Sequence, residues 1–257
     1  LFRSPQTCSV WSQPNPCATS PVPVSGLVNA VTISAGQGIT CATLANGTAK
    51  CWGSNQDGML GIGTTTGPQT CDGFACSTSP TNVSGIANAV TISAGTTSSC
   101  VVLATGTAKC WGYNGLGNLG NGTTTDSSTP VTVLATTNPA TSLTGVVDIS
   151  VGTVGTDLLA CATLANGTAK CWGGSGAGQL GNGTFTGSSI PVTVLAVGAQ
   201  SGSTTPLSGV IAISARGTHK CALVADGTAR CWGLNDYGQL GNGTTTDSST
   251  PVVVSGI

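Results

Sequence analysis

Short runs in which β-branched and other apolar residues alternate with small polar residues recur along the chain. The clearest runs occupy residues 28–36, 90–93, 146–150 and 210–214. Alternation with a period of two is the pattern of a β-strand with one buried face. No stretch combines the 3.6-residue period and the capping residues of an amphipathic helix. The pattern therefore predicts an all-β protein.

A motif that follows each run occurs four times. Its first copy, at 41–53, reads Cys-Ala-Thr-Leu-Ala-Asn-Gly-Thr-Ala-Lys-Cys-Trp-Gly, and similar copies occupy 100–112, 161–173 and 221–233. The tryptophans of successive copies are 59, 61 and 60 residues apart. A repeated unit that cannot bury its own faces stacks on its neighbours to form a core. We therefore expect a single repeat domain over 1–257.

The boundaries of the units follow from the ends of the repeats. Each unit closes on a Pro-Val-x-Val type of segment that predicts a fourth strand, as at 129–133 and 250–254. Residues 20–24 match these endings, and Trp11 stands where the motif tryptophans stand elsewhere. We expect a partial repeat at 1–23, then repeats at 24–83, 84–133, 134–194 and 195–257, the last including the start of a further unit.

Insertions interrupt this frame at positions where loops are expected. They comprise residues 71–76, 136–143, 153–157 and 197–207. Insertions of different length in a fixed frame usually lie on the surface and can carry recognition.

The motif itself predicts a disulfide-stapled hairpin. A three-residue loop that ends at Gly47 in the left-handed conformation places Cys41 opposite Cys51. Directly opposed Cβ atoms lie about 4.5 to 5.5 Å apart, which a disulfide can span after small adjustments. A two-residue Asn46-Gly47 turn would instead place Cys41 opposite Trp52. The bridge therefore favours the longer loop.

All twelve cysteines are expected to form disulfides. The same spacing pairs Cys100 with Cys110, Cys161 with Cys171 and Cys221 with Cys231, and the short intervals pair Cys8 with Cys17 and Cys71 with Cys76. Metal ligation is the alternative, but no Cys-x-x-Cys occurs. Regular disulfides indicate an oxidising compartment, so we expect a secreted or cell-surface protein.

Charge excludes several classes of partner. The chain has seven Lys or Arg and eight acidic residues, all Asp, with a net charge of −1. Such a balance provides no field to attract nucleic acid or acidic lipid. No run of 18 apolar residues occurs, so membrane insertion is not expected. The chain starts without Met or an apolar leader, from which we expect that a leader was removed or that the chain is part of a longer protein.

Segments 52–61 and, more clearly, 232–243 resemble the signature of the regulator-of-chromosome-condensation (RCC1-like) repeat family. The resemblance recurs at 111–122 and 172–183, covers about residues 24–254, and includes an upstream element at 215–223 with Arg216 in a glycine position. It implies a β-propeller of four-stranded blades, commonly seven in a ring. With about four full repeats, the chain is a segment of a larger propeller, closes a smaller ring, or forms an open arc that completes its ring with another chain.

The family's activities do not transfer with its fold. Its members include a nuclear exchange factor for a small GTPase and secreted bacterial proteins that bind and inhibit a hydrolase. The charged surface and the wedge on which exchange activity depends are absent from the sequence. The resemblance is to a propeller of the secreted bacterial type.

Catalytic and cofactor chemistry has little support. His219 is the only histidine and stands at the family's structural His position, where other repeats have Ile39, Ser98 and Leu159. No serine lies in a nucleophile-elbow motif, and no Gly-rich segment is followed by the helix start and Lys of a phosphate site. We expect no catalytic residue, no metal and no cofactor.

Two aspartates allow a calcium interpretation. Asp126 and Asp247 each lie in Gly-Thr-Thr-Thr-Asp-Ser-Ser, but calcium needs several oxygen ligands from a denser acidic loop, and Gly187 takes this place in repeat three. A loop cap is the better interpretation.

Six asparagines satisfy the Asn-x-Ser/Thr pattern for glycosylation. Five of them also stand in Asn-Gly turn pairs, which explains their recurrence without sugar. The candidates are Asn46, Asn82, Asn121, Asn166, Asn182 and Asn242.

Three functions follow from these observations. The first is a non-enzymatic extracellular or cell-surface propeller that acts as a scaffold or binds a protein partner. The second is a self-assembling subunit in which an incomplete blade of one chain is completed by a strand of the next, giving a ring or filament. The third, a propeller enzyme, lacks the acid, base and metal groups that it would need.

Overall fold

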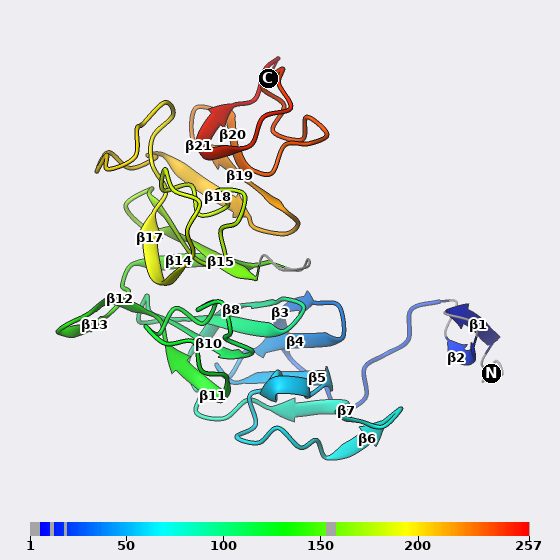
Figure 1. Cartoon of the computed structure of the whole chain (residues 1–257). Helices are drawn as coiled ribbons and strands as arrows, with labels where there is room; N and C mark the ends of the chain where they lie inside the picture. The colour runs from blue at the N-terminus through cyan, green and yellow to red at the C-terminus, as the bar shows by residue number, and fades with distance from the viewer. Residues whose placement is uncertain (1–5, 11–12, 18–19, 153–157, 257) are drawn as a thin grey trace.

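The computed structural model describes residues 6–10, 13–17, 20–152 and 158–256. The described residues form β-strands, loops and one 3-10 turn, η1 (Gln56–Gly58). Four antiparallel sheets follow one another along an open arc (Figure 1). The predicted disulfide-stapled β-propeller architecture is thereby confirmed. None of the described helical segments is long and apolar enough to span a bilayer.

Each sheet is one blade, and its strands pair in chain order. Blade 1 contains β3 (Ala30–Ala35), β4 (Ile39–Leu44), β5 (Ala49–Ser54) and β7 (Phe74–Asn82), with β6 (Gln69–Cys71) added outside β7. Blade 2 contains β8 (Ala89–Ala94), β9 (Ser98–Leu103), β10 (Ala108–Gly112) and β11 (Ser127–Thr132). Blade 3 contains β14 (Val146–Val151), β15 (Leu159–Leu164), β16 (Ala169–Gly173) and β17 (Ser188–Thr193). Blade 4 contains β18 (Val210–Ser214), β19 (His219–Val224), β20 (Ala229–Gly233) and β21 (Ser248–Val253).

The hairpin between the second and third strands of each blade has the predicted register. Cys41 lies opposite Cys51, and the amide of Leu44 donates to the carbonyl of Thr48 at 2.8 Å. Gly47 closes the loop with a φ of 78°. A residue with a side chain would be strained there, which is why glycine recurs at this place in all four repeats.

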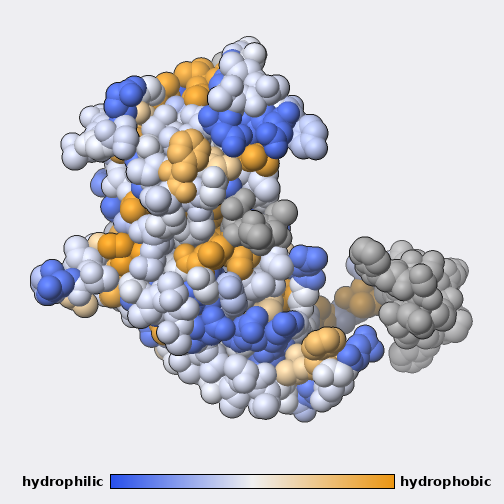
Figure 2. Space-filling view, in the orientation of Figure 1, coloured by the Kyte–Doolittle hydropathy of each residue, from blue (hydrophilic) through white to orange (hydrophobic). Residues whose placement is uncertain are grey.

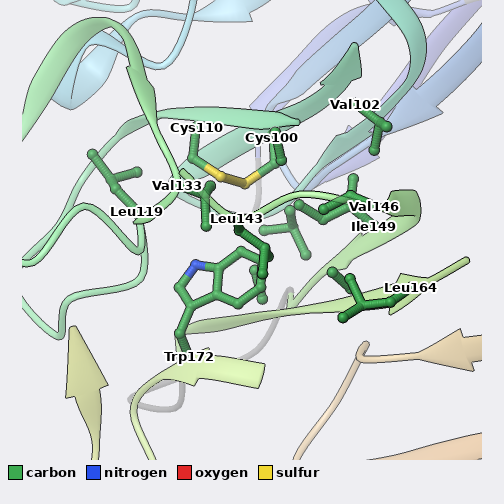
Figure 3. Close-up of a cluster of buried hydrophobic side chains, with 14 residues drawn as sticks. Cys100, Val102, Cys110, Leu119, Val133, Leu143, Val146, Ile149, Leu164 and Trp172 are labelled. Atoms are coloured by element: carbon green, nitrogen blue, oxygen red, sulfur yellow. A yellow bond between two sulfur atoms is a disulfide. The ribbon is translucent and has the colours of Figure 1, made fainter. Parts of the chain in front are cut away.

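The hydrophobic core lies between blades rather than within them. Figure 3 shows the cluster between blades 2 and 3, where Trp172 packs near the Cys100–Cys110 bridge and beside Val133 and Leu143. Each of these five residues is at most 3% exposed. Similar clusters fill the other two junctions between blades. A single blade could not bury these side chains alone, so blades are stable only in a stack.

Two insertions contain strands that the sequence did not predict. Residues 71–76 join β6 and β7 in a hairpin that widens blade 1 to five strands. The insertion at 136–143 contributes to a separate hairpin of β12 (Leu134–Thr137) and β13 (Ala140–Ser142). The insertion at 197–207 is closed by a bridge between Leu195 and Pro206, and 153–157 lies outside the described residues.

The N-terminal segment differs from the expected repeat ending. β1 (Gln6–Val10) and β2 (Gln13–Cys17) form a hairpin of their own, apart from the blades in Figure 1. Residues 21–24 belong to no strand, although the matching segments are in β11 and β21. Pro21 and Pro23 cannot donate to a ladder, and no neighbouring strand of the described chain pairs with them. The expected strand at 20–24 is therefore wrong.

Candidate functional site

A buried tryptophan joins each blade to the one before it. The indole N–H of Trp111 donates to the carbonyl of Met59 at 2.8 Å, that of Trp172 to Asn118 at 3.0 Å and that of Trp232 to Gln179 at 2.9 Å. All three indoles are fully buried. Each therefore combines a large apolar contact with a satisfied hydrogen bond, as a buried tryptophan requires.

The loop that receives each tryptophan is held by a buried polar side chain. In blade 2 the Asn114 carboxamide accepts from the amide of Leu119 at 2.9 Å and donates to the carbonyls of Thr123 and Thr125. Asn55 makes the equivalent bonds in the blade 1 loop that receives Trp111. Asn235 makes them in the blade 4 loop, which receives no tryptophan in the described chain. This role was not predicted from the sequence, although the asparagine recurs beside the tryptophan motif.

The first blade presents the same surface, and no other blade of the described chain packs on it. The contact that the described chain makes there from another blade is that of Arg216, whose guanidinium donates to the Ala35 carbonyl at 3.4 Å and to the Ser34 hydroxyl at 3.5 Å. Ile33 is 63% exposed, whereas its counterparts Ile92, Ile149 and Ile213 are at most 7% exposed. Trp52 is likewise partly exposed, and it makes no indole hydrogen bond of this kind in the described chain. We call the surface formed by Ile33, Ala35, Trp52 and Thr78 the blade 1 end face.

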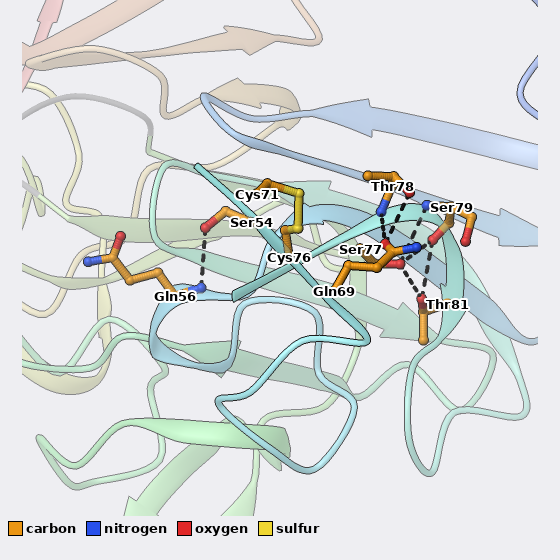
Figure 4. Close-up of a disulfide and its surroundings, with 9 residues drawn as sticks. All are labelled: Ser54, Gln56, Gln69, Cys71, Cys76, Ser77, Thr78, Ser79 and Thr81. Carbon is orange, nitrogen blue, oxygen red and sulfur yellow. Dashed lines mark hydrogen bonds between the residues drawn. A yellow bond between two sulfur atoms is a disulfide. The ribbon is translucent and has the colours of Figure 1, made fainter. Parts of the chain in front are cut away.

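A pocket of about 550 Å³ adjoins the blade 1 end face. It is lined by Trp52, by Phe74 and by the hairpin closed by the Cys71–Cys76 disulfide. Phe74 is 64% exposed. Figure 4 shows this disulfide near Ser54, and Gln69 accepts hydrogen bonds from Thr78 in the same hairpin. An apolar pocket bordered by a rigid, bridged loop has the form of a recognition site.

The fourth blade ends in the opposite surface, also without a neighbour. Leu223 is 43% exposed, whereas its counterparts Thr43, Val102 and Thr163 are at most 1% exposed. The turn after β20 contains Gly238. A Cβ added there would lie 3.6 Å from its nearest neighbour, an ordinary contact distance, so no blade of the described chain packs closely against this turn. We call the surface formed by Ser214, Leu223, Gly238, Gln239, Gly241 and Gly243 the blade 4 end face.

The cysteines form the predicted staples where their side chains are described. Bridges join Cys41 to Cys51, Cys71 to Cys76, Cys100 to Cys110, Cys161 to Cys171 and Cys221 to Cys231. No free cysteine remains among the described side chains. Cys8 and Cys17 stand on β1 and β2, but their side chains lie outside the described residues, so this pair stays a prediction.

The two repeated aspartates cap loops. A carboxylate oxygen of Asp126 accepts from the amide of Asn114 at 2.7 Å, and Asp247 does the same for Asn235 at 2.7 Å. Within the described residues no three His, Cys, Asp or Glu side chains gather as metal ligands would. The loop-cap interpretation is confirmed for both residues.

His219 begins β19 and is half-buried. Burial lowers its pKa, and the adjacent Lys220 lowers it further. A base that is neutral near pH 7 is useful in catalysis only with a nucleophile or acid in reach. The hydrogen bonds and ion pairs described for the chain give it neither, so it carries no functional assignment.

The glycosylation candidates lie in exposed or half-buried turns. In the turns at Asn46 and Asn166 the carboxamide oxygen accepts from the amide and hydroxyl of the threonine two residues later. Asn121, Asn182 and Asn242 accept in the same way, and Asn82 is exposed at the end of β7. Their turn role is thus explained, and their modification stays a prediction.

The surface has no dominant charge. Figure 2 shows apolar residues in separate patches among neutral ones, with only small hydrophilic areas on this face. The one ion pair between described side chains joins Arg230 to Asp226 at 3.9 Å. The two end faces therefore differ from their covered counterparts inside the arc by exposed apolar groups rather than by charge.

Comparison with known proteins agrees with this architecture. Two models of the regulator of chromosome condensation (RCC1) repeat match, one at residues 46–102 and 226–257 and the other at 30–58 and 210–239. The chain thus contains repeats of this kind.

Related curated proteins are longer than this chain. The ultraviolet-B receptor UVR8 of Arabidopsis thaliana is 29% identical over 240 residues, which are 91% of this chain and 48% of the receptor. The human E3 ubiquitin-protein ligase HERC2 is 28% identical over 219 residues, 84% of this chain and 4% of the ligase. The chain spans about half of the first relative and a small part of the second.

Solved structures show the same fold. Human WBSCR16 superposes with a TM-score of 0.72 at 19% identity, over 98% of this chain and 59% of that protein. Yeast RCC1 (Prp20), in a structure with Kap60, gives 0.68 at 18% identity, over 91% of this chain and 50% of that one. At these identities the likeness shows the fold, a β-propeller.

Proposed function

We propose that this chain is a non-enzymatic protein-binding module that acts outside the cell or at its surface. The observation that carries the proposal is the exposed apolar surface at the blade 1 end face and its pocket. Ile33 and Phe74 are both more than 60% exposed there. Exposed apolar groups on a blade face and beside a pocket are typical of interaction sites.

The composition supports apolar recognition of another protein. With few charges and a net of −1, the chain has no long-range field to collect charged ligands. A single histidine and eight acidic residues provide little material for catalysis. A propeller of the same fold, Prp20p of Saccharomyces cerevisiae, binds Gsp1p and histones.

The disulfides support an extracellular location. Four of the five described bridges each connect the two middle strands of one blade. Such bonds persist in oxidising compartments and are rare in the cytosol. We expect the chain in the medium or on the cell surface of its source, with all thiols resistant to alkylation. Recovery of a cytosolic chain with free thiols would contradict this location.

Affinity capture tests the binding proposal. The immobilised chain is incubated with extracellular fluid from its source, beside a Phe74→Asp variant and a Phe185→Asp control. Phe185 is 55% exposed but lies in the loop between β16 and β17 of blade 3, and it does not line the pocket. A partner retained by the chain and the control, but lost with Phe74→Asp, supports the site. Equal capture by all three, or no capture, counts against it.

A further inference from the structure

Three hydrogen bonds recur at every junction between blades. The first is the indole bond to a carbonyl of the preceding blade. In the second, the amides of Gly63, Gly122 and Gly183 donate to the carbonyls of Ser128, Ser189 and Ser249 at 2.8 to 2.9 Å. In the third, the hydroxyls of Ser34, Ser93 and Ser150 accept from the amides of Ala94, Val151 and Ala215 at 3.0 Å.

A fourth set of the same groups is divided between the two ends of the arc. The blade 4 end face carries the groups that, at internal junctions, bond to the following blade. They are the Gln239 carbonyl, the Gly243 amide and the Ser214 hydroxyl. The blade 1 end face carries the groups that, at internal junctions, bond to the preceding blade. They are, in the same order, the Trp52 indole, the Thr78 carbonyl and the Ala35 amide. None of these three pairings is made within the described chain.

The shapes of the two faces are also complementary. At the three internal junctions an added Cβ on Gly61, Gly120 or Gly181 would meet the next tryptophan at 2.7 to 2.8 Å, so the indole lies directly on these glycines. Gly241 has the same turn conformation, with a φ of 65°. No tryptophan lies against it in the described chain, and the nearest side chain to an added Cβ is that of Val254 in the same blade, at 3.0 Å. Among the described tryptophans, Trp52 is the one whose indole lies on no such glycine. Exposed Leu223 would face exposed Ile33 in the same contact.

We propose that the blade 4 end face of one copy packs against the blade 1 end face of a second copy, as one blade packs on the next within the chain. The proposal rests on the blade 1 end face being a protein-binding surface. A second copy is the occupant because this chain itself carries the whole matching set of donors, acceptors, apolar residues and glycines. The four sheets are complete in the described residues, so the contact joins faces and needs no strand exchange.

The two faces differ, so the contact is head to tail. A head-to-tail contact makes a ring when the rotation between copies closes and a filament when it does not. Two copies contribute eight blades, which is within the range of about four to eight found in closed propellers. The expected product is therefore a dimer in which each end face is used once per copy.

Light scattering after size exclusion tests the assembly over a dilution series. We expect a particle of twice the chain mass of 24.9 kDa at high concentration. Ile33→Asp and Leu223→Asp should each shift the particle to monomer at the same concentrations, because each places a charge in a contact without a partner. Ile211→Asp is the matched control, since Ile211 is 58% exposed at the β18 bulge, a position exposed in every blade.

Mixing the two variants tests the direction of the contact. A mixture of Ile33→Asp and Leu223→Asp chains contains one intact pair of end faces, so a heterodimer should form where each variant alone is monomeric. Circular dichroism and the unfolding midpoint of each variant verify that it is folded. A monomeric wild-type chain at all concentrations, or no heterodimer in the mixture, would overturn the proposal. A monomer that still captures an extracellular protein would leave the proposed function standing.

Discussion

At the scale of single residues, identical side chains in identical repeats have different environments. Trp52 and Trp172 both follow the second cysteine of the hairpin, but Trp172 is fully buried and hydrogen-bonded, whereas Trp52 is partly exposed. The difference arises because a preceding blade covers one and not the other. The energetic role of a repeat residue therefore depends on which blade carries it.

We expect Trp172→Ala to reduce the free energy of unfolding by about 3 to 5 kcal/mol, because it leaves a cavity in the core between blades 2 and 3. Trp52→Ala should reduce it clearly less in dilute solution, where the copies are separate. Urea denaturation of both variants measures the difference. Equal losses would show that Trp52 is also buried in solution.

The pH dependence of stability should include a contribution from Asp148. Burial on β14 raises its pKa above the ordinary value of 3.8. The folded chain then binds this proton more tightly than the unfolded chain, so its favourable contribution is present at low pH and is lost as the pH rises through the raised pKa. Asp148→Asn should therefore gain stability over the wild type as pH rises from the acid range to neutrality.

Denaturation at several pH values measures this gain. Asp236→Asn serves as the control that removes one carboxylate at an exposed site. If the difference in unfolding free energy between Asp148→Asn and the wild type stayed constant with pH, the raised pKa of Asp148 would be contradicted.

At the scale of elements, the disulfide hairpin stiffens each blade from within. Cys161 and Cys171 are fully buried at the junction of β15 and β16, whereas the Cys71–Cys76 bridge closes a hairpin at the outer edge of blade 1. The two bridges are chemically equal but stabilise different structures. The Cys161–Cys171 bridge is part of the core between blades 3 and 4. The Cys71–Cys76 bridge lines the pocket.

Replacing Cys161 and Cys171 together by Ala should cost about 2 to 3 kcal/mol of stability, as expected for the loss of a short closed loop. Replacing Cys71 and Cys76 by Ser should change the unfolding midpoint less. It should instead loosen the pocket hairpin, which limited proteolysis between residues 69 and 78 would detect. A larger global loss from the edge pair would contradict this division.

Close packing of turns against the next blade gives a second test at this scale. A Cβ on Gly117 would lie 2.6 Å from the Ser189 backbone, whereas one on Gly238 meets nothing nearer than 3.6 Å, and both residues have a φ near 70°. Gly117→Ala and Gly238→Ala share the conformational strain of about 1 kcal/mol. Only Gly117→Ala adds a steric clash, so its thermal midpoint should fall further. Equal midpoints would contradict the stacking geometry.

At the scale of the whole molecule, the arc is a one-dimensional stack with two different ends. Three core clusters connect four blades, and the outer surfaces of the first and last blades take part in none of them. In such arrays stability comes from the units and the junctions between them. The ends should therefore open more easily than the middle.

Hydrogen exchange in dilute solution should show this gradient. The amides of Ala94, Val151 and Ala215 donate across junctions and should exchange slowly, whereas that of Ala35, on the blade 1 end face, should exchange faster. Raising the protein concentration should slow exchange at Ala35 if copies associate. Uniform protection at all dilutions would contradict an open end.

Much of this architecture follows from local sequence. The alternating runs place β3, β8, β14 and β18 to within a few residues, and the Cys-to-Cys spacing with glycine at the loop determines the hairpin register. These features depend on contacts between residues close in the chain, so one repeat contains the necessary information. The strands of the inserted hairpins were not predicted, because their polar residues carry no clear alternation.

The sequence by itself therefore determined the strands, the turns, the disulfide register and the number of repeats. Only the tertiary structure decided which copies of a repeated residue are covered. Ile33 and Ile92 stand in the same local sequence, Ala-Val-Thr-Ile-Ser-Ala, yet one is 63% exposed and the other 5%. Burial depends on the neighbouring blade, some 60 residues away, and no local pattern records whether that neighbour is present.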